Sequence, residues 1–190
     1  MAATQHSRSF DTPAVRRPPA RVTGLERLTF RQVILLFIPA YALHILEEFP
    51  RFIEWTHRYP GLYGAAMDAT KFAVGDALFV TYVLVSVGLL LRAPEPVGVV
   101  AGLSIPAWAL TNALLHLPLT LVSGVYSPGA ISAAMLYVPL SALAYDRARK
   151  EGILSPRRLA ISVAIGACST RCWRSGGSLA DLRDGPSGGM

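Results

Sequence analysis

The sequence places one histidine and two glutamates inside an otherwise apolar stretch. His44-Ile-Leu-Glu47-Glu48 lies within residues 32–49, a length that is about sufficient for one helix to cross a lipid bilayer. An ionisable side chain at the centre of a bilayer costs about 2.5–3.5 kcal/mol on insertion scales and more on simulation scales. We therefore expect these three side chains to have polar partners, a water-filled cavity or a metal ion.

The spacing of the polar residues suits a metal site. In a helix, His44 lies one turn from both Glu47 and Glu48, so either carboxylate can neighbour the imidazole. Asn112 and His116 stand four residues apart in another apolar stretch and share one helix face. Two imidazoles and a carboxylate are suitable ligands for zinc, iron or manganese. Such a set leaves coordination positions open for water or a substrate.

Each of these residues also has a structural interpretation. His44 and Glu48 could form a buried hydrogen-bonded pair without a metal. Glu47 lies near a helix end and could reach the membrane interface, whereas the amide of Asn112 could join two helices. Asp76, in a further apolar stretch, could be an isolated acid paired with a nearby lysine or a helix N-terminus.

Composition predicts an all-α membrane protein. Of the 190 residues, 52% are hydrophobic and 16% are charged, and the mean hydropathy is +0.41, which is too apolar for an ordinary soluble domain. Long apolar stretches cover residues 32–49, 72–91, 97–122 and 128–145. A helix needs about 20 residues to cross a bilayer core of about 30 Å. Since no stretch alternates as barrel strands do, the sequence predicts a polytopic bundle of four transmembrane helices.

The basic residues predict how these helices are oriented. Arginine and lysine are frequent in residues 1–31 and 147–158, whereas residues 123–127 carry no charge. By the positive-inside rule, both flanks lie in the cytoplasm. The net charge of +6 thus reflects membrane topology, and we expect no nucleic-acid partner. In this topology, polar residues of three spans lie at a similar depth in the outer half of the membrane: His44, Asp76, Asn112 and His116.

The sequence divides into four regions. The composition of residues 1–29 predicts a disordered basic arm, and residues 30–146 are expected to form the four-helix membrane domain. Residues 147–168 hold a basic loop and about ten apolar residues, which are too few to span. Residues 169–190 predict a disordered tail. The short apolar run could lie at the membrane interface, or it could be a fifth hydrophobic segment cut by truncation or a reading-frame shift.

Three motifs together resemble a known family. His44-Ile-Leu-Glu47-Glu48, Asn112-Ala-Leu-Leu-His116 and the turn at residues 126–129 (Tyr-Ser-Pro-Gly) resemble, in order and spacing, the HXXEE-motif family of small bacterial and archaeal integral membrane proteins. The resemblance covers about residues 30–145. It implies a multi-span bundle and a metal-dependent membrane enzyme, but no substrate. The polar C-terminal region departs from the family, whose members continue into another hydrophobic segment.

We therefore expect an integral plasma-membrane enzyme, with its N-terminus in the cytoplasm, that depends on a divalent zinc, iron or manganese ion. His44, Glu48 and His116 would bind the metal. Glu47 would act as general base or fourth ligand, and Asn112 would orient a ligand or the substrate. The expected chemistry is hydrolysis by an activated water, or oxygen activation at iron, on a lipid-like or small amphiphilic substrate.

Two other functions fit the same residues. The carboxylates and histidines could bind or relay a cation or protons in a transport protein, although four spans without an internal repeat are unusual for a carrier. The polar cluster could also belong to a structural membrane subunit. Two details stay open at this point: whether Asp76 joins the site, and whether the hydroxyls of residues 126–127 approach it or cap the following helix.

Overall fold

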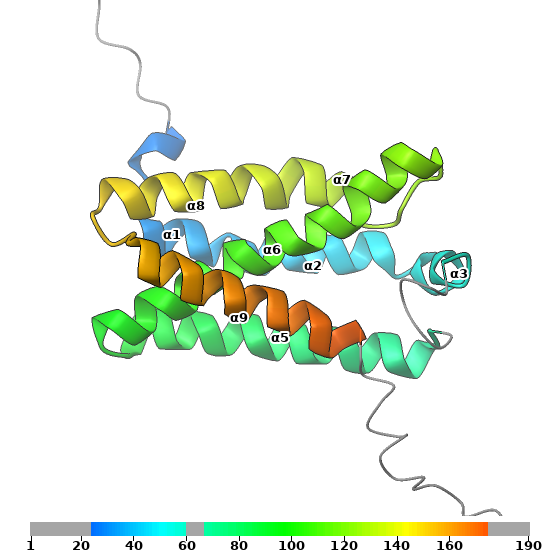
Figure 1. The fold of residues 1–190 in the computed structure, drawn as a ribbon, viewed down its shortest axis with the longest axis horizontal. Helices are drawn as coiled ribbons and strands as arrows, with labels where there is room; N and C mark the ends of the chain where they lie inside the picture. Colours follow the sequence, from blue (N-terminus) through cyan, green and yellow to red (C-terminus); the bar gives the residue numbers. More distant parts are fainter. Residues whose placement is uncertain (1–23, 60–66, 175–190) are drawn as a thin grey trace, which may run out of the picture.

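A computed structural model describes residues 24–59 and 67–174, and every regular element within these ranges is helical. The long helices lie side by side along one axis, and the short helix α3 (Phe52–Thr56) covers one end (Figure 1). The prediction of an all-α fold is confirmed. Most of the predicted N-terminal arm and residues 175–190 of the predicted tail lie outside the described residues.

Three helical stretches are long and apolar enough to cross a membrane among the described residues: Phe30–Glu48, Ala69–Arg92 and Glu95–Ser123. The first comprises α1 (Phe30–Leu35) and α2 (Phe37–Glu48), and the other two are α5 and α6. They coincide with the first three predicted spans. Large apolar side chains point outward along them, and Leu46, Leu78 and Leu121 are 69%, 61% and 82% exposed. This pattern fits helices whose outer faces contact lipid.

The region of the predicted fourth span is helical but is not one of these three stretches. Helix α7 (Ala130–Ser132), the π-helical segment η2 (Ala133–Tyr137) and α8 (Val138–Lys150) follow one another without a gap and lie beside α1 and α6. The π-helical segment precedes Pro139, which lacks an N–H and would clash with the carbonyl of Met135 in a regular α-helix. A wider turn at this point accommodates the proline.

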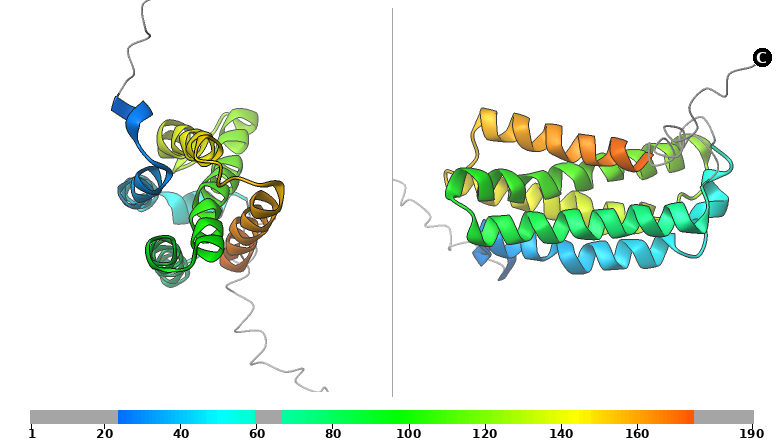
Figure 2. Two further views of the ribbon diagram at one scale, coloured as in Figure 1. Left: turned by 90° about the vertical axis from the view of Figure 1, so that its left-hand side faces the viewer. Right: turned by 90° about the horizontal axis from the view of Figure 1, so that it is seen from below.

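Helix α9 (Pro156–Arg174) occupies the region of the predicted fifth segment. It is 19 residues long and continues beyond Cys168, where the sequence predicted a disordered tail to begin. It lies along α6, and α5 packs on the other side of α6 (Figures 1 and 2). The approach is close at Gly166, where an added Cβ would stand 2.6 Å from the backbone nitrogen of Trp108. Packing against α6 therefore orders residues whose polarity alone predicted disorder.

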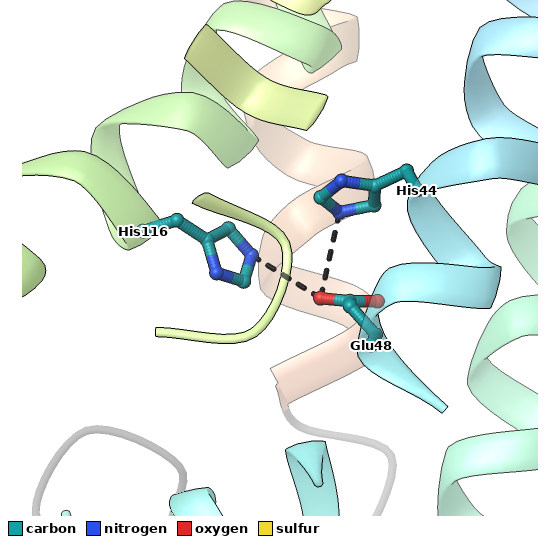
Figure 3. Close-up of side chains that lie close together, drawn as sticks. All are labelled: His44, Glu48 and His116. Atoms are coloured by element: carbon teal, nitrogen blue, oxygen red, sulfur yellow. Dashed lines mark ion pairs between the residues drawn. The ribbon is translucent and has the colours of Figure 1, made fainter. Parts of the chain in front are cut away.

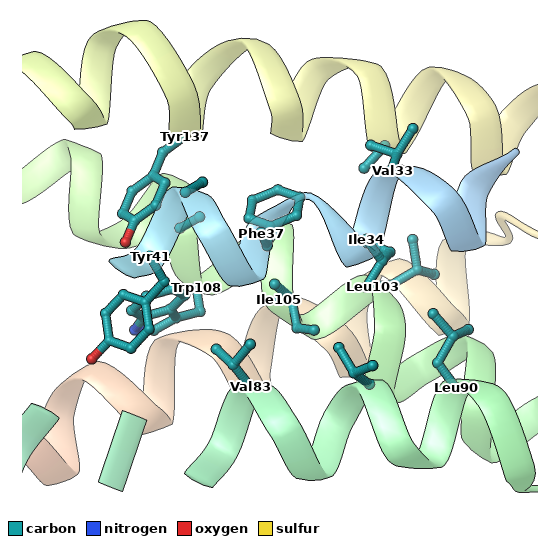
Figure 4. Close-up of a cluster of buried hydrophobic side chains, with 14 of the residues drawn as sticks. Val33, Ile34, Phe37, Tyr41, Val83, Leu90, Leu103, Ile105, Trp108 and Tyr137 are labelled. Carbon is teal, nitrogen blue, oxygen red and sulfur yellow. The ribbon is translucent and has the colours of Figure 1, made fainter. Parts of the chain in front are cut away.

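The hydrophobic core lies between α1, α2, α5, α6 and η2. Phe37 and Tyr41 from α2 face Leu103 and Trp108 from α6, and Tyr137 from η2 closes the cluster (Figure 4). The rings of Tyr41 and Trp108 meet edge to face with centroids 5.2 Å apart, a favourable aromatic geometry. This core fixes α2 relative to α6, the two helices that carry the candidate metal ligands.

A smaller apolar cluster covers the end of the bundle near residue 116. Phe52 and Trp55 from α3 pack with Met67 and Phe72, and all four side chains are buried. The rings of Phe52 and Trp55 also lie 6.1 and 6.2 Å from the His116 ring, centroid to centroid. Helix α3 therefore shields this end of α6 from solvent.

The contact between α9 and α6 predicts unequal effects of two glycine substitutions. Gly166→Ala should destabilise the protein by about 1–3 kcal/mol, because its Cβ meets backbone that cannot move aside. Gly88→Ala, near the C-terminal end of α5 (Ala69–Arg92), meets nothing within 4 Å and should be neutral or stabilise by up to about 1 kcal/mol. Thermal unfolding in detergent compares the two, and equal stabilities would contradict the close packing of α9.

Candidate metal centre

Three of the predicted site residues converge in the structure. His44 and Glu48 stand one turn apart on α2, and His116 reaches them from α6 (Figure 3). Glu48 Oε1 lies 3.4 Å from His44 Nε2 and 3.2 Å from His116 Nε2. The three side chains are buried, with only 1%, 5% and 2% of His44, Glu48 and His116 exposed. One potential ligand atom from each lies within 4.8 Å of the other two.

These separations are compatible with a shared metal ion. Nitrogen and oxygen ligands bind zinc at about 2.0–2.2 Å, so neighbouring ligand atoms of a tetrahedral site stand about 3.3 Å apart. The two measured separations from Glu48 Oε1 are 3.4 and 3.2 Å. Two imidazoles and one carboxylate also suit iron and manganese. The donor set and its spacing therefore fit a divalent transition metal.

The hydrogen bonds of His44 assign its tautomer. Its Nδ1 lies 2.7 Å from Ser132 Oγ, and Ser132 Oγ donates its own hydrogen to the Gly129 carbonyl at 3.1 Å. When the single hydroxyl hydrogen of Ser132 is directed at the Gly129 carbonyl, Nδ1 carries the proton in its contact with Ser132. In a neutral ring, Nε2 then presents a lone pair, and this buried atom has no hydrogen-bond partner among the described residues. A lone pair on Nε2 is the form that binds a metal.

His116 is held in the same way from the opposite helix. Its Nδ1 lies 2.8 Å from Ser127 Oγ. The backbone N–H of Ser127 donates to Thr120 Oγ1 at 3.1 Å, and Thr120 donates in turn to the His116 carbonyl at 2.8 Å. These bonds fasten the turn at residues 124–129 to α6. A serine hydroxyl thus orients each imidazole through the nitrogen that faces away from Glu48, as outer partners do in metal sites.

Gly129 brings its backbone against the cluster. Its φ is +95°, a conformation that residues with a side chain rarely adopt. An added Cβ would stand 2.7 Å from His44 Cε1, 3.1 Å from His116 Cε1 and 3.2 Å from Glu48 Cγ. The glycine of the Tyr-Ser-Pro-Gly turn is therefore required both for its backbone conformation and for the space that the two imidazoles occupy.

Glu47, expected as general base or fourth ligand, is not one of the three clustered residues. Its carboxylate accepts the backbone N–H groups of Ile131 at 2.9 Å and Ser132 at 2.7 Å, and the Tyr126 hydroxyl. Burial and the bond to Glu47 raise the pKa of Tyr126 above its ordinary value, so this hydroxyl stays protonated as a donor. Glu47 thereby binds the N-terminus of α7 and positions Ser132 against His44.

Asn112 and Asp76 line a small cavity beside the cluster. The cavity has a volume of about 20 Å³ and is also bordered by His44, Glu48 and His116, which is room for about one water molecule. The Oδ1 atom of Asn112 is buried and has no hydrogen-bond partner among the described residues. Asp76 accepts a 3.3 Å hydrogen bond from Tyr41, so it is not an isolated acid. Both polar residues thus lie where a small ligand would meet the cluster.

Sequence reasoning missed two residues at this site. Ser132 directly precedes the π-helical segment and Tyr137 ends it, and the Tyr137 ring packs on the His44 ring with centroids 4.7 Å apart. Neither belongs to a motif with a histidine or glutamate. Pro139 was the available signal, because a proline within an apolar helix marks a local departure from α-helical geometry. Such π-helical turns often occur at functional sites.

The close approach of Gly129 predicts a large difference between two glycine substitutions in one turn. Gly124 also has a positive φ, +66°, but an added Cβ there meets nothing within 4 Å. Each alanine introduces backbone strain of about 1–2 kcal/mol, and Gly129→Ala adds about 1–3 kcal/mol from its clash with the histidines. Gly129→Ala should therefore unfold at a lower temperature than Gly124→Ala. Equal unfolding temperatures would show that the turn does not press on the cluster.

Comparison with known proteins identifies a family. The model of the family described as "protein of unknown function with HXXEE motif" matches residues 35–144, which include the clustered residues and the turn that covers them. No curated protein and no solved structure shows a significant match to the chain. Because the family model covers more than half of the sequence, the chain belongs to the family of proteins of unknown function that carry the HXXEE motif.

Proposed function

We propose that the protein is a metal-dependent integral membrane enzyme whose divalent metal is held by His44, Glu48 and His116. The observation that carries this proposal is the convergence of three buried groups: His44 Nε2 and His116 Nε2 stand 3.4 and 3.2 Å from the same carboxylate oxygen of Glu48, and His44 Nε2 carries a lone pair when its Nδ1 holds the proton of a neutral ring. Two electron-rich atoms at this distance in a buried site repel each other unless a cation lies with them. A divalent cation shared with His116 removes that repulsion.

The serine contacts support a metal over a simple polar pair. A structural ion pair would need imidazolium rings with N–H groups directed at the carboxylate; His116 Nε2 and His44 Nε2 stand 3.2 and 3.4 Å from Glu48 Oε1, but the His44 contact is not a well-formed hydrogen bond. Ser132 and Ser127 instead hold both rings through Nδ1. This arrangement resembles the outer partners that orient metal-binding histidines and raise their basicity.

The chemistry proposed for the site uses the cavity next to the ligands. A bound divalent ion would supply Lewis-acid activation of water or, in the case of iron, oxygen chemistry. Asn112, which lines the same cavity and whose Oδ1 has no hydrogen-bond partner among the described residues, would orient the water or the substrate. Asp76 and Tyr41 would accept and donate hydrogen bonds there. Glu47 takes a positioning role in this proposal, because its carboxylate already binds backbone amides of α7.

The proposed placement in the membrane follows from the helices and the flanking charges. We add helical residues 130–145 as a fourth span to the three apolar stretches, with residues 124–129 on the outer side. Arginine and lysine residues in the first 31 residues and after residue 146 then lie in the cytoplasm. The metal site faces the outer half of the bilayer in this arrangement, where a lipid-like or small amphiphilic substrate is available.

A proton- or cation-relay function is the second candidate. The hydrogen bond between Tyr41 and Asp76 ends in the same cavity as Glu48, so these groups could pass a proton along without a tightly bound metal. The two functions differ in metal content, which the next experiment measures.

Purified protein should contain close to one equivalent of zinc, iron or manganese by elemental mass spectrometry. His44→Ala, Glu48→Ala and His116→Ala should each lose it, because three ligands are needed to hold the ion. His57→Ala is the matched control, since His57 is exposed and contacts the Met67 carbonyl outside the cluster. Circular dichroism checks that each variant stays helical. Wild-type protein that binds no metal even after reconstitution would refute the proposal and favour the relay.

The hydrogen bonds between the serines and the histidine Nδ1 atoms predict a smaller effect, on metal affinity. Ser132→Ala removes the acceptor of the His44 Nδ1 proton and should lower metal affinity by about 10–100-fold, the usual effect of losing such a partner. Ser123→Ala, at the exposed end of α6, should leave affinity unchanged. Competition with a chelating dye measures both. If Ser132→Ala binds metal as tightly as the wild type, the tautomer of His44 is not set by Ser132.

A further inference from the structure

A groove between α5, α6 and α9 has an apolar floor and a basic end. It has a volume of about 740 Å³ and lies between the two helices of the α5–α6 hairpin and α9. Apolar side chains such as Leu89, Val97, Val100 and Ile161 line most of it. Ser155, Arg157 and Arg158 lie at the end of the groove where α9 begins. The groove thus combines a long apolar surface with one cationic end.

The two arginines stand where a helix disfavours positive charge. The N-terminus of a helix carries a partial positive charge, so cations in the first turn are unfavourable there and anions are favourable. Arg158 is partly neutralised, because it pairs with Glu95 at 2.9 Å and donates to the Ile153 carbonyl at 2.9 Å. Arg157 is exposed and forms no ion pair with any residue in the described part of the chain. The local charge is therefore complementary to an anion.

We propose that this groove binds an anionic phospholipid, with its phosphate at Arg157 and Arg158 and an acyl chain along the apolar floor. The turn at Ala93 and Pro94 joins the ends of two membrane-spanning stretches and so marks the membrane surface. The ion pair between Arg158 and Glu95 holds the start of α9 at that level. Phospholipids supply phosphate at this level with acyl chains beneath it, and basic sites between membrane helices recognise their headgroups.

The groove continues along α9 toward the other end of the bundle. A second hollow of about 510 Å³ shares Tyr82 and Ile165 with the groove. Phe79 lines this second hollow and also the small cavity beside Glu48. An acyl chain that follows α9 from the arginines therefore runs toward the wall of the cluster. Binding of the lipid itself requires no metal.

Native mass spectrometry in detergent can measure the affinity for phosphatidylglycerol and for phosphatidylcholine with identical acyl chains. The wild type should prefer phosphatidylglycerol by about fivefold or more for each arginine that contacts the phosphate. Arg157→Gln/Arg158→Gln should abolish this preference. Arg149→Gln/Lys150→Gln removes the same number of charges at the end of α8, where both residues pair with Asp146, and should retain it.

A second pair of variants tests the apolar floor. Ala101 lines the groove, so Ala101→Phe should weaken phosphatidylglycerol binding by about tenfold, as expected for displacing two or so methylene groups. Ala77→Phe, on the exposed face of α5, should leave the affinity for phosphatidylglycerol unchanged. Equal binding of the two lipids by the wild type, or equal losses in test and control variants, would overturn the proposal. Unfolding temperatures within a few degrees of the wild type confirm that the variants are folded.

Discussion

The contact of Glu48 with His44 and His116 is the interaction on which the rest of this structure depends. A carboxylate that is 5% exposed must be neutralised or paired, since an isolated buried charge is strongly destabilising. Its partners come from two helices far apart in the sequence, so α2 and α6 must approach each other at one depth. The aromatic core of Tyr41, Trp108 and Tyr137 holds them there.

The turn at residues 124–129 and the π-helical segment also serve to hold the two imidazoles beside Glu48. Each imidazole needs a partner for its outer nitrogen, and Ser127 and Ser132 supply these from either side of Gly129. The glycine lets the chain pass directly over both rings. Glu47 then satisfies the first backbone N–H groups of the following helix. The two adjacent glutamates of the motif thus have separate tasks: Glu48 completes the cluster and Glu47 anchors the segment that orients it.

Much of the cluster was predictable from helical spacing, because the interval between His44 and Glu48 puts them on one face of a helix. His116 was predictable from its depth, since the charges that flank the spans place it at the same level of the membrane as His44. The role of Glu47 was not predictable, because adjacent residues on a helix point in different directions and only the tertiary fold decides which one faces the cavity.

The remaining features depend on packing between elements. Tyr137 was missed because a π-helical turn sets the direction of its side chain, and Ser132 was missed because the tertiary fold brings the start of that segment against His44. The extent of α9 was missed because its order comes from the packing of Gly166 on α6 and not from its own polarity.

X-ray absorption spectroscopy at the metal edge is the sharpest test of the proposed metal centre, because it reports the ligand atoms themselves. We expect nitrogen and oxygen ligands at about 2.0–2.2 Å, with scattering from two imidazole rings that falls to one ring in His116→Ala. A spectrum without imidazole scattering, or one that His116→Ala leaves unchanged, would contradict a metal centre built from His44, Glu48 and His116.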